Sequence, residues 1–224
     1  MSSQLPALIF DLDGTILDSK PGILSCFRKV LDSYGVEAHG SLDRFVGPPI
    51  EDWASEMLPN GSDEARAALA GDYRSCYDLE GWKKSTLFAG VRELLDQLHE
   101  EGFPLYVCTS KRHHFAVRIL DTLELTGLFI AVYGDKAEYR SHNKTDLLAT
   151  LLRECELSSG SAWMIGDRIF DTEAARANQI RCLAAGWGYG SEEESALADK
   201  VAATPAEVFA LLSPQNHSEV LDVK

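Results

Sequence analysis

The chain has 224 residues, a formal net charge of −14 at pH 7 and 45% hydrophobic residues. Such an acidic chain is repelled by the nucleic-acid backbone and by anionic lipid surfaces, so we expect neither a nucleic-acid polymer nor a membrane as a partner. The apolar content argues against wholesale disorder, and no apolar run approaches the roughly 20 residues of a membrane-spanning helix. The length suits one large domain, or a core with a smaller insert.

The cysteines and the first residues suggest a compartment. The count of five cysteines is odd, none forms a C-x-x-C pair, and we interpret them as small apolar fillers. The first six residues lack the basic region and the long apolar stretch of a signal peptide. We therefore expect a reduced, cytoplasmic protein, either a monomer or a homodimer.

Short apolar runs without alternation mark the predicted strands. Such runs are typical of strands that are buried on both faces of a parallel sheet. In chain order they cover residues 7–10, 105–108, 129–133, 162–165 and 180–184.

Helical patterns separate these strands. Apolar residues recur at helical spacing within residues 91–98, 115–123 and 147–152. Alternation of strand and helix predicts an α/β fold with a doubly wound parallel sheet. Ligands of such sheets bind at the carboxyl ends of the strands, so the polar residues that follow the strands become candidates for the site.

One stretch interrupts the alternation. Residues 20–86 contain no convincing strand, but they contain helical patterns at 23–31 and 65–77. We interpret this stretch as a small helical cap inserted into a core formed by residues 1–19 and 87–213. The polar, aperiodic residues 214–224 are predicted to be a flexible tail.

The first strand runs into Asp11-Leu12-Asp13-Gly14-Thr15. If the strand continued through this segment, Asp11 and Asp13 would lie on one face, and two such carboxylates repel each other unless a cation or proton accompanies them. This favours a metal-assisted nucleophile beside an acid/base. The alternative is an ordinary turn rich in Asp and Gly.

A second acidic pair follows the strand at residues 162–165. Asp167 comes just after this strand and Asp171 lies four residues later, so both could face one spot if a helix begins between them. The alternative is a helix N-terminus that carries acids because the helix dipole favours them.

Two further segments could bind an anion. Thr109 and Ser110 follow the second predicted strand, where hydroxyls and free amides can hold phosphate or simply cap a helix. Lys144 opens the helix at 147–152, where a cation opposes the helix dipole. Either a bound anion explains this lysine, or it is a solvated surface residue.

Together these four segments resemble the haloacid dehalogenase superfamily of phosphatases. The segment 11–15 matches its first motif, Thr109 the second, Lys144 the third, and Gly166-Asp167 with Asp171 the fourth. The order and spacing match across about residues 7–185. The chain is most similar to the phosphoglycolate phosphatase and 5'-nucleotidase branch, which has a helical cap after the first motif. Three segments resemble bacterial members of this branch, namely residues 73–77, residues 87–91 and Trp187-Gly188-Tyr189-Gly190.

The resemblance implies a role for each motif residue. Asp11 would attack phosphorus, and Asp13 would protonate the leaving alcohol and then activate water. Mg²⁺ would be held by Asp11, the Asp13 backbone carbonyl and Asp167, with Asp171 supporting a metal-bound water or orienting Lys144. Phosphate would be held by the residues of the loop and of the second and third motifs, namely Gly14, Thr109, Ser110 and Lys144.

The chain departs from the family pattern in two places. Thr145 follows the third-motif lysine where the family often has proline, and Lys111, Arg112, Arg140 and His142 offer alternative cations nearby. In the cap, Gly47 matches a glycine of the family's substrate loop. Arg44 and Arg74 are either substrate contacts or solvated cap residues.

We therefore expect a Mg²⁺-dependent phosphomonoester hydrolase acting on a small phosphorylated metabolite, such as a nucleoside 5'-monophosphate or 2-phosphoglycolate. A phosphosugar mutase with the same core is one alternative, because closure of the cap decides whether water reaches the phospho-enzyme. A non-catalytic phosphate-binding protein is another, but it would be expected to have lost one of the chemical residues.

Overall fold

The computed structural model describes residues 5–47, 50–136 and 143–212. These residues form two compact units, one made of residues 18–86 and the other made of the chain on either side of that segment. Two short strands, β2 (Leu17–Asp18) and β3 (Thr86–Leu87), form a two-stranded sheet where the chain passes from one unit to the other. No helix among the described residues is long and apolar enough to cross a membrane.

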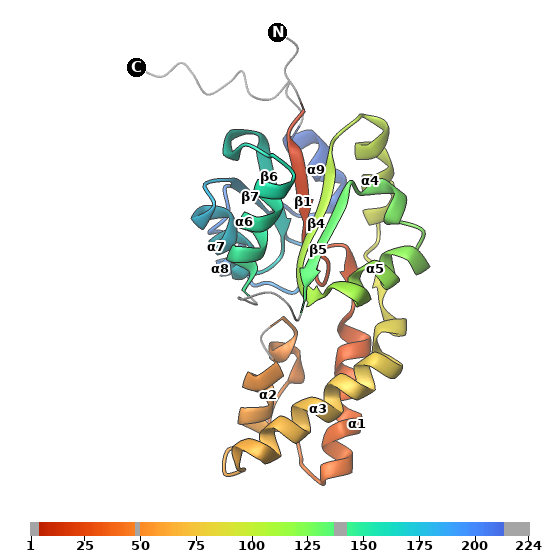
Figure 1. Cartoon of the computed structure of the whole chain (residues 1–224), viewed down its shortest axis with the longest axis vertical. Coiled ribbons are helices and arrows are strands. Elements are labelled where there is room, and N and C mark those ends of the chain that lie inside the picture. The colour runs from red at the N-terminus through yellow and green to blue at the C-terminus, as the bar shows by residue number, and fades with distance from the viewer. Residues whose placement is uncertain (1–4, 48–49, 137–142, 213–224) are drawn as a thin grey trace. The chain divides into compact units, whose positions relative to one another are not determined.

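The larger unit is built on a parallel sheet of six strands in the order β5-β4-β1-β6-β7-β8 (Figure 1). This confirms the predicted α/β fold with a doubly wound sheet. The strands are β1 (Ala7–Phe10), β4 (Leu105–Arg112), β5 (Ala131–Asp135), β6 (Ala162–Gly166), β7 (Arg181–Ala185) and β8 (Lys200–Ala202).

Helices cover both faces of this sheet, as its apolar strands require. Alternate side chains of β1, β4 and β6 pack with α6 and α7 in one buried cluster that includes Ile9, Tyr106 and Met164. The side chains between them, such as Leu8 and Phe10, are also buried. The helices are α4 (Val91–Glu100), α5 (His113–Thr122), α6 (Lys144–Glu154), α7 (Ile169–Ala177), α8 (Glu192–Ser195) and α9 (Pro205–Leu212), with short 3-10 turns at Thr126–Leu128 and Ser159–Ser161.

The smaller unit is helical. Its helices are α1 (Lys20–Tyr34), α2 (Ile50–Met57) and α3 (Asp63–Leu79), with 3-10 turns at Leu42–Phe45 and Gly81–Lys84. Its core is aromatic, because Phe27 stacks on Trp53 and on Tyr73 with ring centroids 4.6 and 4.7 Å apart.

Several predicted boundaries were wrong. The run at 129–133 is displaced from β5, and β4 continues through Thr109 and Ser110 to Arg112, past the predicted end at Cys108. β1 ends at Phe10, so strand alternation does not govern how Asp11 and Asp13 face. The helices α2 and α9 and the short strands β2, β3 and β8 were not predicted from the sequence.

Candidate active site

The site lies where the sheet reverses its order of connection. β1 lies between β4 and β6, so the chain segments after these three strands meet at one edge. Asp11 follows β1, Asp167 follows β6, and Thr109 lies near the end of β4. This is the crevice in which open α/β sheets bind their ligands.

Three carboxylates form the centre of the site. Asp11, Asp167 and Asp171 are buried, and one ligand oxygen from each lies within 4.8 Å of the others. Asp11 lies in the loop after β1, held by a hydrogen bond of 2.8 Å from its amide to the Ile165 carbonyl. Asp171 lies in the first turn of α7, where its carboxylate accepts a 3.0 Å hydrogen bond from the Arg168 amide.

Lys144 is the cation that contacts this cluster. It is the first residue of α6, its side chain is only 6% exposed, and its Nζ lies 2.8 Å from Asp11 Oδ2. The same Nζ makes an ion pair with Asp171. Burial opposes its charge, but the carboxylates of Asp11 and Asp171 raise the pKa of Lys144 above its usual value, so it stays an ammonium.

Burial and neighbouring charges raise the pKa values of two of these carboxyl groups. Burial, together with the Asp171 charge and against the attraction of Lys144, raises the pKa of Asp11 to about 6. Burial and the charges of Asp171 and Asp11 raise the pKa of Asp167 to about 7. Among the described residues, one ammonium therefore does not balance the charge of three buried carboxylates, and a further cation would stabilise the cluster.

The residues present fit a divalent cation. Asp11 Oδ1 is buried and has no hydrogen-bond partner among the described residues. A buried oxygen normally has a partner, and a bound metal ion would supply one. Carboxylate oxygens in a compact group are the ligands that Mg²⁺ prefers. The cluster can therefore hold a hard cation next to the Asp11 carboxylate, which also contacts the Lys144 ammonium.

Asp13 has a different partner, Lys111, for which the sequence predicts no role of its own. Its two carboxylate oxygens accept hydrogen bonds of 3.0 and 2.7 Å from Lys111 Nζ, and the Lys111 side chain is only 7% exposed. Lys111 had been considered only as an alternative to Lys144. The extension of β4 to Arg112 places it here, and its partner was not visible from spacing alone.

The glycine-rich segment after β7 also proved to be part of the site. The Tyr189 amide donates a 2.8 Å hydrogen bond to Asp167 Oδ2, and Thr15 Oγ1 lies 3.3 Å from Asp167 Oδ1. Trp187 Nε1 donates to the Thr15 carbonyl at 2.9 Å. From the sequence this segment shows only a family likeness, whereas in the structure it orients the Asp167 carboxylate.

Two glycines leave no space for a side chain around Asp167. A Cβ on Gly14 would lie 2.2 Å from Asp167 Oδ2, and a Cβ on Gly188 would lie 2.3 Å from the Asp167 Cβ. Gly14 also has a φ of +86°, a conformation that favours glycine. The close packing holds the carboxylate in one place.

The predicted phosphate contacts differ in exposure. Thr109 is buried, and its Oγ1 accepts a 3.2 Å hydrogen bond from the Lys111 amide, whereas Ser110 is exposed. Both lie on β4 and do not cap a helix, because α5 begins only at His113. Of the alternative cations, Arg140 and His142 lie outside the described residues.

The predicted cap contacts have partners inside the helical unit. Arg44 makes an ion pair with Glu56 and donates to the carbonyls of Ser41 and His39 at 3.0 and 3.2 Å. Arg74 makes an ion pair with Glu51. Gly47 is exposed and has a φ of +108°, a backbone conformation that favours glycine at this position whether or not it contacts a substrate.

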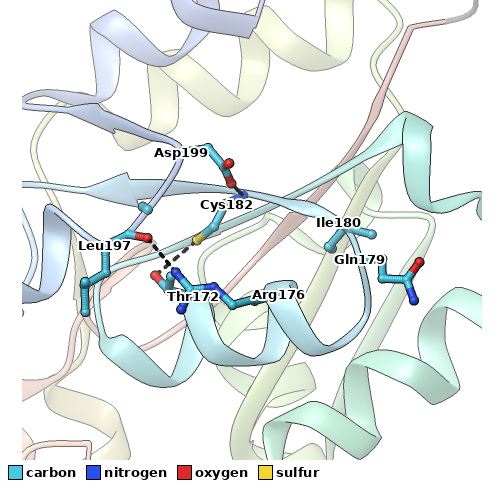
Figure 2. Close-up of a pocket in the computed structure, with 8 residues that line it drawn as sticks. Thr172, Arg176, Gln179, Ile180, Cys182, Leu197 and Asp199 are labelled. Atoms are coloured by element: carbon cyan, nitrogen blue, oxygen red, sulfur yellow. Dashed lines mark hydrogen bonds between the residues drawn. The ribbon is translucent and has the colours of Figure 1, made fainter.

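A separate cavity of about 260 Å³ lies between α7 and β7 (Figure 2). Its two charged side chains bond to residues of the cavity wall: Arg176 donates to the Leu197 carbonyl at 3.3 Å, and Asp199 accepts from the Cys182 amide at 2.8 Å. None of the predicted site residues lines it, so we assign it no ligand.

Comparison with known proteins shows which family the chain belongs to. The family model of haloacid dehalogenase-like hydrolases matches residues 8–185. A 5'-nucleotidase of Pseudomonas aeruginosa is 35% identical over 194 residues, which are 85% of this chain and 87% of that protein. The tyrosine-protein kinase PtkA of Mycobacterium tuberculosis is 37% identical over 82% of this chain, but the match spans only 62% of PtkA.

A solved structure points to the same family. The structure of a haloacid dehalogenase-like hydrolase from Streptococcus pneumoniae has a TM-score of 0.85 and 31% identity, covering 93% of this chain and 99% of that one. The family match, the relative and the structural neighbour confirm the predicted family resemblance and the assignment as a hydrolase. The chain belongs to the family of haloacid dehalogenase-like hydrolases.

Proposed function

We propose that the protein is a Mg²⁺-dependent phosphomonoester hydrolase that works through an aspartyl-phosphate on Asp11. The observation that carries this proposal is the buried cluster of Asp11, Asp167 and Asp171, in which Lys144 makes ion pairs with Asp11 and Asp171. Phosphoryl transfer depends mainly on positioning and on charge stabilisation, and this cluster supplies charges of both signs.

Asp11 is the proposed nucleophile. Its Oδ2 is held by Lys144, while its Oδ1 has no hydrogen-bond partner among the described residues. A carboxylate oxygen of Asp11 attacks phosphorus, the bond from phosphorus to the leaving oxygen breaks, and an acyl phosphate forms. Lys144 keeps Asp11 ionised and neutralises charge on the phosphoryl group.

Mg²⁺ would be held by the Asp11 and Asp167 carboxylates and the Asp13 carbonyl, with Asp171 in a supporting position. When bound, it supplies charge neutralisation for the phosphoryl oxygens and for the attacking carboxylate. Mg²⁺ is our choice because the donors are all hard oxygen ligands.

Asp13 is the proposed general acid and base. It donates a proton to the leaving alcohol in the first step and takes a proton from the attacking water in the second. Its ion pair with Lys111 fixes the carboxylate next to the nucleophile loop. We propose that Gly14, Thr109, Ser110 and Lys144 hold the phosphoryl oxygens.

The substrate is proposed to be a small phosphorylated metabolite, and nucleoside 5'-monophosphates lead. The activity named for the Pseudomonas relative supports this choice over 2-phosphoglycolate. Residues 20–86 are proposed to act as a cap that selects the leaving group, with Arg44, Gly47 and Arg74 as candidate contacts. A mutase remains the second candidate because it would use the same Asp11 and Asp13.

The test is phosphate release from a panel of nucleoside 5'-monophosphates, 2-phosphoglycolate and hexose phosphates, with Mg²⁺ and with chelator. We expect release only with Mg²⁺ and loss of at least about 1,000-fold in an Asp11→Asn variant. Asp121→Asn is the matched control, because Asp121 is an exposed residue of α5 away from the site. Unchanged turnover in Asp11→Asn refutes the proposal, and isomerisation of a hexose phosphate without phosphate release favours the mutase.

A further inference from the structure

Two cysteines lie in contact inside the helical unit, and neither belongs to the acidic cluster. Cys26 belongs to α1 and Cys76 to α3, the two helices that lie alongside each other in Figure 1. Both are free thiols, and their Sγ atoms are 2.6 Å apart although the residues are 50 positions apart in the chain. The fold therefore brings two oxidisable sulfur atoms together.

The two sulfur atoms differ in access to solvent. Cys26 is fully buried, and the backbone at Gly81 closes against it, since a Cβ there would lie 2.9 Å from Cys26 Sγ. Cys76 is only half-buried, and its Sγ lies 3.5 Å from Glu80 Oε1. A small reagent from solvent therefore meets Cys76 before Cys26.

A metal ion is the other use of this cluster, since Cys26, Cys76 and Glu80 could supply three ligands. Two thiolates on one tetrahedral zinc, each at about 2.3 Å, lie roughly 3.8 Å apart, so both sulfur atoms would have to move outward by more than 1 Å in total. Glu80 Oε1 is also occupied, because it forms a 2.7 Å ion pair with Lys29. The geometry therefore favours a bond between the sulfur atoms over a shared cation.

We propose that Cys26 and Cys76 form an oxidation site, at which a hydroperoxide such as hydrogen peroxide converts the two thiols into an intrachain disulfide that joins α1 to α3. This modification does not depend on the proposed phosphatase reaction, because no residue of the acidic cluster takes part in it.

The chemistry balances with one peroxide molecule. The Cys76 thiol loses its proton to water and its Sγ attacks one peroxide oxygen; the O–O bond breaks, and the departing hydroxide takes a proton to become water. Cys76 is then a sulfenic acid. The Cys26 thiol loses its proton, its Sγ attacks Cys76 Sγ, the S–O bond breaks, and a second water leaves. Two thiols are oxidised by two electrons and the peroxide is reduced to two waters.

The order of these steps follows from burial as well as access. Burial, the hydrogen bond from Cys76 and the charge of Glu80 raise the pKa of Cys26 to about 12, so its thiolate is scarce at neutral pH. Cys76 is therefore the sulfur that meets the oxidant, and Cys26 is the sulfur that resolves the sulfenic acid.

The test uses the full chain, first reduced and desalted, then treated with hydrogen peroxide, blocked with iodoacetamide and digested with trypsin without reduction. Cleavage at Arg28, Arg74 and Lys83 places Cys26 in peptide 1–28 and Cys76 in peptide 75–83, each without another cysteine. We expect the two peptides joined, with a mass equal to their sum less two hydrogen atoms, and separated again by dithiothreitol.

Three variants sharpen the test. Cys26→Ala should leave Cys76 as a sulfenic acid that dimedone traps, and Cys76→Ser should leave Cys26 reduced at the same dose of peroxide. Cys76 is half-buried, so Cys76→Ser still tests the proposal if Cys26→Ala does not fold, as judged by circular dichroism. Cys155→Ser is the control: Cys155 is also half-buried, and this variant should form the joined peptide as the wild type does.

Three results would overturn the proposal. The first is alkylation of both Cys26 and Cys76 at peroxide doses that oxidise Cys155. The second is overoxidation of Cys76 to the sulfinic acid while Cys26 stays alkylated. The third is one tightly bound zinc per chain in the purified protein, lost in Cys76→Ser, since that shows the pair to be a metal site.

Discussion

Replacing Lys144 should strongly destabilise the fold, because this lysine neutralises two buried carboxylates. Lys144→Met keeps most of the apolar volume but leaves the carboxylates of Asp11 and Asp171 buried without their ammonium. At the 2.8 Å separation of Lys144 Nζ and Asp11 Oδ2, two unit charges attract by about 6 kcal/mol at an effective dielectric constant of about 20. Desolvation offsets part of this attraction, and breaking a buried ion pair costs about 3–5 kcal/mol.

We expect Lys144→Met to lower the free energy of unfolding by about 3–5 kcal/mol in chelator, measured by urea denaturation and far-ultraviolet circular dichroism. Adding Asp171→Asn should recover a large part of that loss, because it removes one of the two carboxylates left unpaired. Saturating Mg²⁺ should stabilise Lys144→Met more than it stabilises the wild type, since no ammonium then competes with the cation.

Lys29→Met is the matched control, because it breaks an ion pair with Glu80 in which the Lys29 side chain is 63% exposed. Its effect on stability should be close to the limit of detection. A loss below about 1 kcal/mol in Lys144→Met, similar to that of an exposed pair, would refute our account of the buried cluster. Lack of any recovery from Asp171→Asn would refute it equally.

Three further predictions concern the same site. Lys111→Met should lower kcat about tenfold for an alkyl phosphate but much less for p-nitrophenyl phosphate, whose leaving group needs no proton; an equal loss for both would show that Lys111 does not position Asp13. Mg²⁺ binding should weaken as the pH falls from 8 through 6, because carboxyls whose pKa values are raised to about 6 and 7 then hold protons that the metal must displace; calorimetry that shows constant affinity would contradict the assignment of Asp11 and Asp167 as ligands. Gly14→Ala should weaken Mg²⁺ binding and lower Tm, because its Cβ would lie 2.2 Å from Asp167 Oδ2; an unchanged Mg²⁺ affinity would refute the fixed position of Asp167. Gly71→Ala is the control: no atom lies within 4 Å of its Cβ and the residue is inside α3, so it should leave Mg²⁺ affinity unchanged and should not lower Tm.

Sequence periodicity was enough to predict the sheet and the edge at which the site lies. The strand at Ala7–Phe10 was predicted with its observed bounds because all four of its side chains are apolar and buried. The predicted bounds of β5 were displaced because four of its five residues are only half-buried, so its apolar pattern is weaker than that of a fully buried strand. β4 was predicted too short because its last four residues, Thr109–Arg112, are polar and end the apolar run.

The partners of the polar side chains were harder to predict than their positions. The sequence singled out Asp11, Lys144 and Asp171, but the ion pairs among them depend on how α6 and α7 pack against the sheet. The pairing of Lys111 with Asp13 joins residues 98 positions apart, and no local spacing encodes it. The same holds for Cys26 and Cys76, which we first interpreted as separate apolar fillers.

The most direct test of the central claim is to trap the phosphoryl group on Asp11. In an Asp13→Asn variant with Mg²⁺ and p-nitrophenyl phosphate, the first step needs no acid while the second lacks its base, so the acyl phosphate should accumulate. After an acid quench and digestion, mass spectrometry should find one added phosphoryl group on peptide 1–28, located at Asp11 by fragmentation and absent in the Asp11→Asn/Asp13→Asn double variant. Release of p-nitrophenol with peptide 1–28 unmodified, or a phosphoryl group on another residue, would contradict the mechanism.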